Sequence, residues 1–169
     1  MTAAAKAAVQ PDDVETAMRR AMRLLAVRAR SCHEMRDRLL RAGFDEPTAH
    51  AVELRLVDVG LLDDAEFAAQ VARRGAETGK SSRLTRRELQ RFGIGAELAD
   101  DTLAGVDEDV ADEERALQLA ERKAATCRNL PADKAVARVV RHLLGKGYGP
   151  QLAWEVTRKV FDSLEIDGD

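Results

Sequence analysis

A phrase of sequence that occurs three times constrains the fold of this chain more than any other feature. In each copy a leucine is followed four positions later by glycine, then at once by an apolar residue, and five positions after that by alanine. The leucines of successive copies lie 50 and 54 residues apart. Self-similarity at such a period indicates a repeat architecture, in which each repeat is one supersecondary unit. The copies are Leu39-Gly43-Phe44-Ala49, Leu89-Gly93-Ile94-Ala99 and Leu143-Gly147-Tyr148-Ala153.

Each phrase predicts a helix, a stop and a second helix. Glycine directly after an amphipathic run can take the left-handed backbone conformation that ends a helix. We expect the apolar residue after it to pack back on the helix just ended, and the alanine to let the next helix approach its neighbour closely. The expected core anchors are Phe44, Ile94 and Tyr148, and the expected close approaches are at Ala49, Ala99 and Ala153.

Composition favours helices throughout. Charged residues make up 34% of the chain and aromatic residues only 4%, and the apolar residues are mostly aliphatic helix formers. We therefore predict an all-α protein of three tandem three-helix repeats. Since about 50 residues bury little apolar surface alone, the repeats should stack into an elongated, curved array of right- or left-handed sense. The expected divisions are a disordered tail over 1–12, repeats over 13–60, 61–107 and 108–164, and a C-terminal tail over 165–169.

Local signals place several helix starts. An apolar stripe of helical period predicts a first helix over residues 14–29, with Val27 among its core residues. Ser31 has the position of an N-cap for the second helix, and Asp63 or Asp64 that of a cap for the fourth.

The middle repeat departs from the pattern at one core position. Where the outer copies have Met35 and Val139, the middle copy has Thr85. Leu84 beside it is the residue expected to supply the missing apolar contact.

The sequence lacks the marks of an enzyme, a metal protein or a membrane protein. Cys32 and Cys127 match no metal spacing and are expected to be free thiols. His33, His50 and His142 have no partner at ligand spacing, and no phosphate loop or hydrolase motif is present. No stretch approaches the roughly 20 apolar residues that span a bilayer. We expect a cytoplasmic, monomeric, non-catalytic protein without cofactor or metal.

Charge is distributed unevenly although the net charge is only -3. Residues 19–41 hold eight arginines and residues 73–91 hold seven bases, each run with only two acids. A solvated helix face explains many such residues, but surfaces that serve solubility alone normally mix both signs. Arginine binds phosphate and carboxylate alike, so the runs cannot choose between nucleic acid and an acidic protein. The candidate contacts are Arg30, Arg36, Arg73, Arg74, Lys80, Arg83, Arg86, Arg87 and Arg91.

An acidic segment follows the second basic run. Residues 97–114 contain nine carboxylates and no base. Solvation of a linker and of helix N-termini explains this segment, and a basic partner surface is the alternative.

The order and spacing of many individually weak motifs resemble the RecX family of bacterial recombination regulators. The resemblance extends from about Met18 to Val160 and is weakest in the third repeat. It rests on Leu24-Leu25, Arg28, Arg30-Ser31, Glu34-Met35-Arg36, Leu39, Gly43-Phe44, Gly60-Leu61-Leu62-Asp63-Asp64, Phe67-Ala68, Gly79, Glu88-Leu89 and Gly93-Ile94.

The resemblance implies a regulator of the RecA recombinase. Family members are similar in lying along the groove of the RecA filament on single-stranded DNA, where they modulate, mainly inhibit, its ATPase, recombinase and co-protease activities. That implies a part in DNA repair and the SOS response, with the RecA filament, and DNA within or near it, as partners. The alternative is a direct DNA-binding helical-repeat protein that acts without RecA; a scaffold for some other protein is a third possibility.

Overall fold

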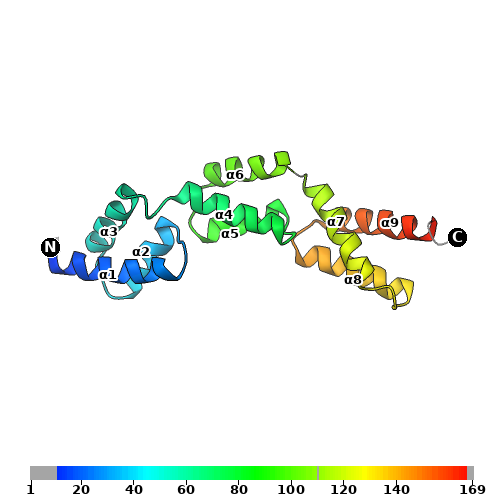
Figure 1. Cartoon of the computed structure of the whole chain (residues 1–169), viewed down its shortest axis with the longest axis horizontal. Coiled ribbons are helices and arrows are strands. Elements are labelled where there is room, and N and C mark those ends of the chain that lie inside the picture. The colour runs from blue at the N-terminus through cyan, green and yellow to red at the C-terminus, as the bar shows by residue number, and fades with distance from the viewer. Residues whose placement is uncertain (1–10, 110, 167–169) are drawn as a thin grey trace, which may run out of the picture. The chain divides into compact units, whose positions relative to one another are not determined.

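The computed structural model describes residues 11–109 and 111–166, which form nine helices and no strand (Figure 1). The predicted all-α class is confirmed. The expected tails lie outside the described residues, except that residues 11 and 12 open the first helix and residues 165 and 166 close the last. The helices are α1 (Pro11–Val27), α2 (Cys32–Arg41), α3 (Glu46–Asp58), α4 (Asp64–Glu77), α5 (Ser82–Arg91), α6 (Ala96–Asp109), α7 (Asp112–Ala125), α8 (Ala132–Gly145) and α9 (Pro150–Ile166).

The helices follow the repeated phrase in groups of three. In each group the phrase spans the end of the second helix and the start of the third. Gly43, Gly93 and Gly147 have φ angles of +94°, +77° and +91°, the left-handed conformation predicted for them. The three alanines of the phrase, at positions 49, 99 and 153, are completely buried, as expected.

The apolar residue after each glycine is buried to a different degree. Ile94 is 4% exposed and Tyr148 2%, whereas Phe44 is only partly buried. The two deeply buried residues lie in loops that a preceding repeat packs against; no helix precedes the first repeat in the described residues. The core anchors are thus confirmed for the second and third repeats and correct only in part for the first.

Each of the two outer repeats has its own apolar core. The first core joins α1, α2 and α3, and the second joins α7, α8 and α9. The predicted stripe of α1 supplies Val14, Ala17 and Ala21 to the first core, but Val27, the last residue of the helix, is 78% exposed and the prediction for it was wrong. The buried residues of the first core are Val14, Ala17, Ala21, Met35, Leu39, Ala49, Val52, Leu56 and Leu62. Those of the second are Ala116, Leu119, Ala120, Ala124, Val139, Val140, Leu143, Tyr148, Ala153, Val156 and Val160.

By packing, the described residues divide into two compact units that do not follow the repeat boundaries. The first unit contains the residues up to Phe67 together with Phe92–Ile94, and the second contains Ala68–Arg91 and the residues from Gly95 onward. The middle repeat therefore contributes to both units.

Within the first unit, the start of α2 is joined to a loop of the middle repeat. The hydroxyl of Ser31 accepts from the backbone N–H of Glu34, as an N-cap should, and donates to the carbonyl of Phe92 at 2.5 Å. The backbone N–H of Cys32 donates to Asp64 Oδ1 at 2.8 Å. The cap of α4 is Asp63, which accepts from the N–H groups of two residues after it. Asp64 thus joins the start of α4 to the start of α2 and does not cap α4.

Within the second unit, the start of α5 repeats the same arrangement fifty residues later. The hydroxyl of Ser81 accepts from the backbone N–H of Leu84. The backbone N–H of Ser81 donates to the carbonyl of Lys146 at 2.9 Å. The N–H of Ser82 donates to Asp112 Oδ1 at 3.1 Å. At least one carboxylate of the acidic segment therefore has a structural partner within the chain.

The threonine of the middle repeat occupies the core position that its sequence register predicts. Thr85 is 2% exposed, and its hydroxyl donates to the carbonyl of Ser81. A Cβ added to Gly75 of α4 would lie 2.6 Å from the Thr85 hydroxyl, so α4 and α5 approach too closely here for a larger side chain. Leu84 is only partly buried and does not replace it.

Candidate anion-binding surfaces

Much of the first basic run is bound within its own repeat. Arg30 is 6% exposed, donates to the carbonyl of Leu24, and pairs with the Glu34 carboxylate at 2.5 Å. Arg28 also pairs with Glu34. The guanidinium of Arg30 is therefore largely buried and bound within its own repeat.

Arg36 is likewise paired, with an acid from another helix. Its guanidinium donates two hydrogen bonds of 2.7 Å to the two oxygens of Glu53, and Glu46 lies 3.8 Å away. These hydrogen bonds, and the charge behind them, raise the pKa of Arg36 above its ordinary value. A fork-to-fork pair of this kind with Glu53, itself 9% exposed, fixes α2 against α3.

The second basic run contains both paired and unpaired cations. Lys80 Nζ lies 2.6 and 2.7 Å from the two oxygens of Glu88, and Arg86 pairs with Asp100. Arg83 donates two hydrogen bonds to the carbonyl of Gly147.

The remaining arginines of this run lie on α4 and α5. Arg73, Arg74, Arg87 and Arg91 are all exposed. Arg74, Arg87 and Arg91 have no ion pair to any residue that the structure describes. Arg87 and Arg91, four residues apart on α5, share one helix face. These side chains fit an external contact better than the rest of the candidate set.

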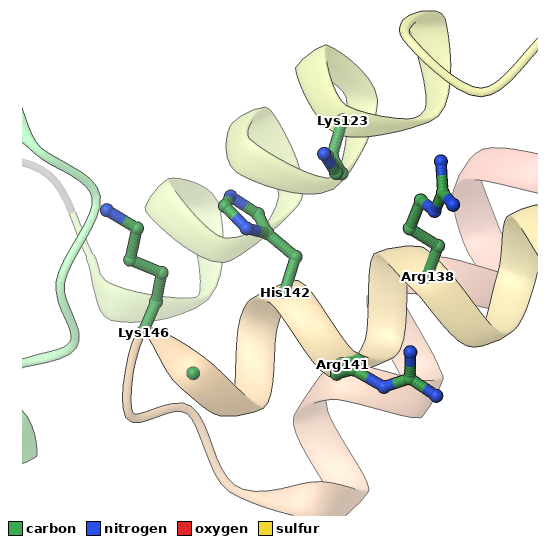
Figure 2. Close-up of a pocket in the computed structure, with 6 residues that line it drawn as sticks. Lys123, Arg138, Arg141, His142 and Lys146 are labelled. Atoms are coloured by element: carbon green, nitrogen blue, oxygen red, sulfur yellow. The ribbon is translucent and has the colours of Figure 1, made fainter.

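A third group of cations, which the sequence reasoning missed, lines an open hollow in the third repeat. The hollow has a volume of about 510 Å³, and none of the described residues that line it is acidic. Figure 2 shows Arg138 and His142 extending from α8 on the side where α7 carries Lys123, with Arg141 pointing away from α7. The lining residues are Lys123, Arg138, Arg141, His142, Gly145 and Lys146.

The sequence did hold a signal for this hollow. Arg138, His142 and Lys146 follow one another at intervals of four, so they lie on one face of α8 on successive turns. The signal was missed because the two longer arginine runs carry more charge per residue, and because Lys123 comes from a different helix.

The electrostatic field inside the hollow is positive. Burial lowers the pKa of His142 below 6.5, and the positive charges of Lys123 and Lys146 lower it further. Lys146 is held in place, since its Nζ donates to the carbonyl of Thr78 at 2.7 Å. A site with several cations, a neutral imidazole N–H and no carboxylate is suited to an anion.

Two further hollows have mixed charge. One lies beside Trp154, which is 51% exposed, with Arg158 and Lys159 but also Glu155 and Asp162. Lys159 is paired there with Glu155 and with Glu113. The other is lined by Arg36, whose charge Glu53 already balances, and by Glu46. Neither offers an anion the uncompensated charge of the α7–α8 hollow.

Nucleophile and metal chemistry find no support among the described residues. Burial raises the pKa of the Cys32 thiol to about 12, and the Asp64 and Glu53 carboxylates add to the effect, so the thiol stays protonated at neutral pH. In the described ranges, no three His, Cys, Asp or Glu side chains gather as metal ligands would, and none of the helices there could cross a bilayer.

Fold and surface together define a tandem three-helix-repeat protein with basic surfaces. Family models for the first, second and third three-helix domains of RecX match residues 17–56, 63–103 and 111–157. The chain belongs to the RecX family of regulatory proteins, which confirms the resemblance found in the sequence.

Relatives in bacteria agree with this assignment. The chain is 40% identical to "Regulatory protein RecX" of Mycobacterium avium over 152 residues, which cover 87% of this chain and 86% of the relative. It is 36% identical to the protein of the same name in Amycolatopsis mediterranei, over 80% of this chain and 78% of the relative. The crystal structure of RecX from Lactobacillus salivarius has the same fold, with a TM-score of 0.71 over 89% of this chain and 98% of that one, at 22% identity.

Proposed function

We propose that this chain binds the RecA recombinase and its filament on single-stranded DNA, and that it modulates, mainly inhibits, the ATPase, recombinase and co-protease activities of RecA. The observation that carries the proposal is the run of three RecX domains, in order, over residues 17–157. The protein acts in this role as a cytoplasmic monomer in DNA repair and the SOS response.

We choose the candidate contacts with the filament by their exposure and by whether they are already paired with an acid. A repeated ligand such as a filament offers the same carboxylates and phosphates at each subunit, and a repeat protein can meet them with similar groups at similar positions. Of the sequence candidates, Arg74, Arg87 and Arg91 are exposed and have no ion pair within the described residues. We assign the filament contact to these three, with Arg73 and Arg83 beside them in sequence. Arg30, Arg36, Lys80 and Arg86 hold the fold.

The test is DNA-dependent ATP hydrolysis by the cognate RecA, titrated with this protein. The variant carrying Arg87→Glu and Arg91→Glu should lose inhibition, because two cations become anions on the contacting face. A matched control carries Arg128→Glu and Lys134→Glu, the same change of charge at exposed positions of the third repeat. Circular dichroism checks that both variants remain helical.

Three results discriminate the possibilities. Loss of inhibition in the α5 variant alone supports the filament contact. Equal inhibition by both variants removes Arg87 and Arg91 from the interface. Inhibition that appears only when the DNA itself is saturated with protein favours the alternative function, direct binding to DNA without RecA, which falls steeply with salt as counterions are released.

A further inference from the structure

We propose that the α7–α8 hollow binds the phosphodiester backbone of single-stranded nucleic acid. It would give the third repeat a direct contact with the DNA strand, separate from any contact with RecA. The inference deepens the proposed function and rests on it for the presence of such a strand.

The lining of the hollow provides the first argument. Lys123 on α7 and Arg138 on α8 line the same hollow (Figure 2), and neither has an ion pair to a described residue. A surface that serves only to keep a protein soluble mixes both signs, but the described residues that line this hollow include no carboxylate. Like charges held together without compensation are costly, so their arrangement suggests a ligand that supplies the opposite charge.

Rigidity provides the second argument. The two helices that carry the lining residues belong to one packed core, in which Leu119, Val139 and Leu143 are buried. Lys146, at its edge, is fixed by its bond to the carbonyl of Thr78 and by its own carbonyl, which accepts from the N–H of Ser81. The cations are thus presented by elements whose positions are set by packing, and little order has to be created when a ligand binds.

Periodicity decides between a nucleic acid and an acidic protein. Arg138 and His142 on α8 and Lys146 at its C-cap form a row at intervals of four residues, about 6 Å apart along the axis. A nucleic-acid strand carries one phosphate per nucleotide at a comparable, regular interval. The carboxylates of a folded protein surface are not tied to one fixed covalent interval. A linear polyanion laid along α8 can therefore meet the Arg138 guanidinium, the His142 imidazole N–H and the Lys146 end of the row in turn, with Lys123 on the neighbouring helix.

The test is binding of fluorescein-labelled oligothymidylate to the full chain without RecA, measured by anisotropy at several salt concentrations. The variant carries Lys123→Gln and Arg138→Gln. The matched control carries Lys134→Gln and Arg128→Gln, which removes one lysine and one arginine from exposed positions of the same repeat outside the hollow. Circular dichroism and the urea midpoint confirm that both variants are folded.

We expect the hollow variant to bind more than about tenfold more weakly than the unmodified protein, since hydrogen bonds from charged donors to phosphate are among the stronger ones. The slope of log affinity against log salt should fall in magnitude by about 1.4, because each single-strand phosphate that a cation neutralises adds roughly 0.7. The control should change both quantities much less.

Four results would overturn the proposal. They are no binding of oligothymidylate by the unmodified protein at low salt, an unchanged salt slope in the hollow variant, equal losses in variant and control, and a hollow variant that loses affinity for DNA-free RecA while keeping affinity for DNA. None of these is the result that defeats the proposed function, which is judged by inhibition of the RecA ATPase. A hollow variant that binds DNA normally and still inhibits RecA would remove this inference alone.

Discussion

The first and third repeats share one helical plan but treat their cations in opposite ways. In the first repeat Arg30 pairs with Glu34 and Arg36 pairs with Glu53, so these arginines hold parts of the repeat together. In the third, Lys123 and Arg138 line one hollow in which none of the described lining residues is acidic. Part of the denser arginine run is therefore already neutralised by acids of its own repeat. The number of basic residues in a segment is a poor guide to where an anion binds, because the position of the acids matters as much.

The comparison is sharpest for stability at Glu34. This carboxylate is 13% exposed and compensates the guanidinium of Arg30, which is 6% exposed. We expect Glu34→Gln to lower the free energy of unfolding by about 3 kcal/mol, because breaking a buried pair leaves an uncompensated charge. Urea unfolding followed by circular dichroism measures the change. Glu15→Gln, which removes an exposed pair with Arg55, should change the value by less than about 1 kcal/mol. Similar losses in the two variants would mean that Arg30 reaches water when its partner is gone.

The glycines that close the second helices allow the same repeats to be compared through the backbone. Gly43 and Gly147 both have positive φ, but a Cβ on Gly43 meets nothing within 4 Å, whereas one on Gly147 would lie 2.5 Å from Leu84 and Ser81 atoms. Gly43→Ala should cost about 1 kcal/mol from the left-handed backbone alone. Gly147→Ala should cost about 2 kcal/mol more, since the junction with α5 must also shift. Equal urea midpoints for Gly43→Ala and Gly147→Ala would show that the loop at Gly147 and the start of α5 can move apart at little cost.

What the sequence could predict follows the range of the interactions involved. Gly93, Ser31 and Ala99 take their expected roles because a helix stop, a cap and a close approach depend on residues only a few positions away. The all-helical fold follows from such signals repeated three times. Phe44 is only partly buried because its burial depends on a neighbouring repeat, which no local pattern reveals.

The candidate site was harder to predict because charge compensation is not local. Within each basic run acids are few, yet Arg36 pairs with Glu53, 17 residues away, and Arg86 pairs with Asp100 on the next helix. Counting acids inside a run therefore overestimates its free charge. The α7–α8 hollow was missed for the converse reason, since Lys123 and Arg138 come together only through the packing of two helices.

His142, in the α7–α8 hollow, should make the stability of the third repeat depend on pH. Its pKa is lowered in the folded protein by burial and by Lys123 and Lys146; Arg138 and Arg141 are further cations in the lining, and none of the described lining residues is a carboxylate. Because the folded-state pKa lies below the unfolded value of about 6.5, its contribution to stability is complete above that pH and is lost as pH falls through the folded-state pKa. Urea midpoints measured on both sides of pH 6.5 should fall less in His142→Gln than in the unmodified protein.

Binding should have the opposite dependence on pH. A phosphate in the hollow raises the pKa of His142, so the complex takes up a proton and affinity for oligothymidylate rises as pH falls below 6.5. The gain should be less than about tenfold, the factor that corresponds to a one-unit change of pKa. It should disappear in His142→Gln. Affinity that rises equally in both proteins would assign the pH dependence to other groups.

The smallest expected effect is a difference of sign between the two repeats. Arg41 is 74% exposed and pairs with Asp37 at 3.0 Å, so Arg41→Gln should lower the free energy of unfolding slightly. Lys123 has no acidic partner among the described residues and faces other cations, so Lys123→Gln should raise that free energy slightly. Both changes should lie within about 0.5 kcal/mol. Paired urea titrations at low salt resolve the sign, and added salt should shrink both effects. If both variants lose stability, Lys123 has a stabilising partner in solution. The contrast between paired cations in the first repeat and unpaired cations in the third would then be wrong for Lys123, the residue on which it most depends.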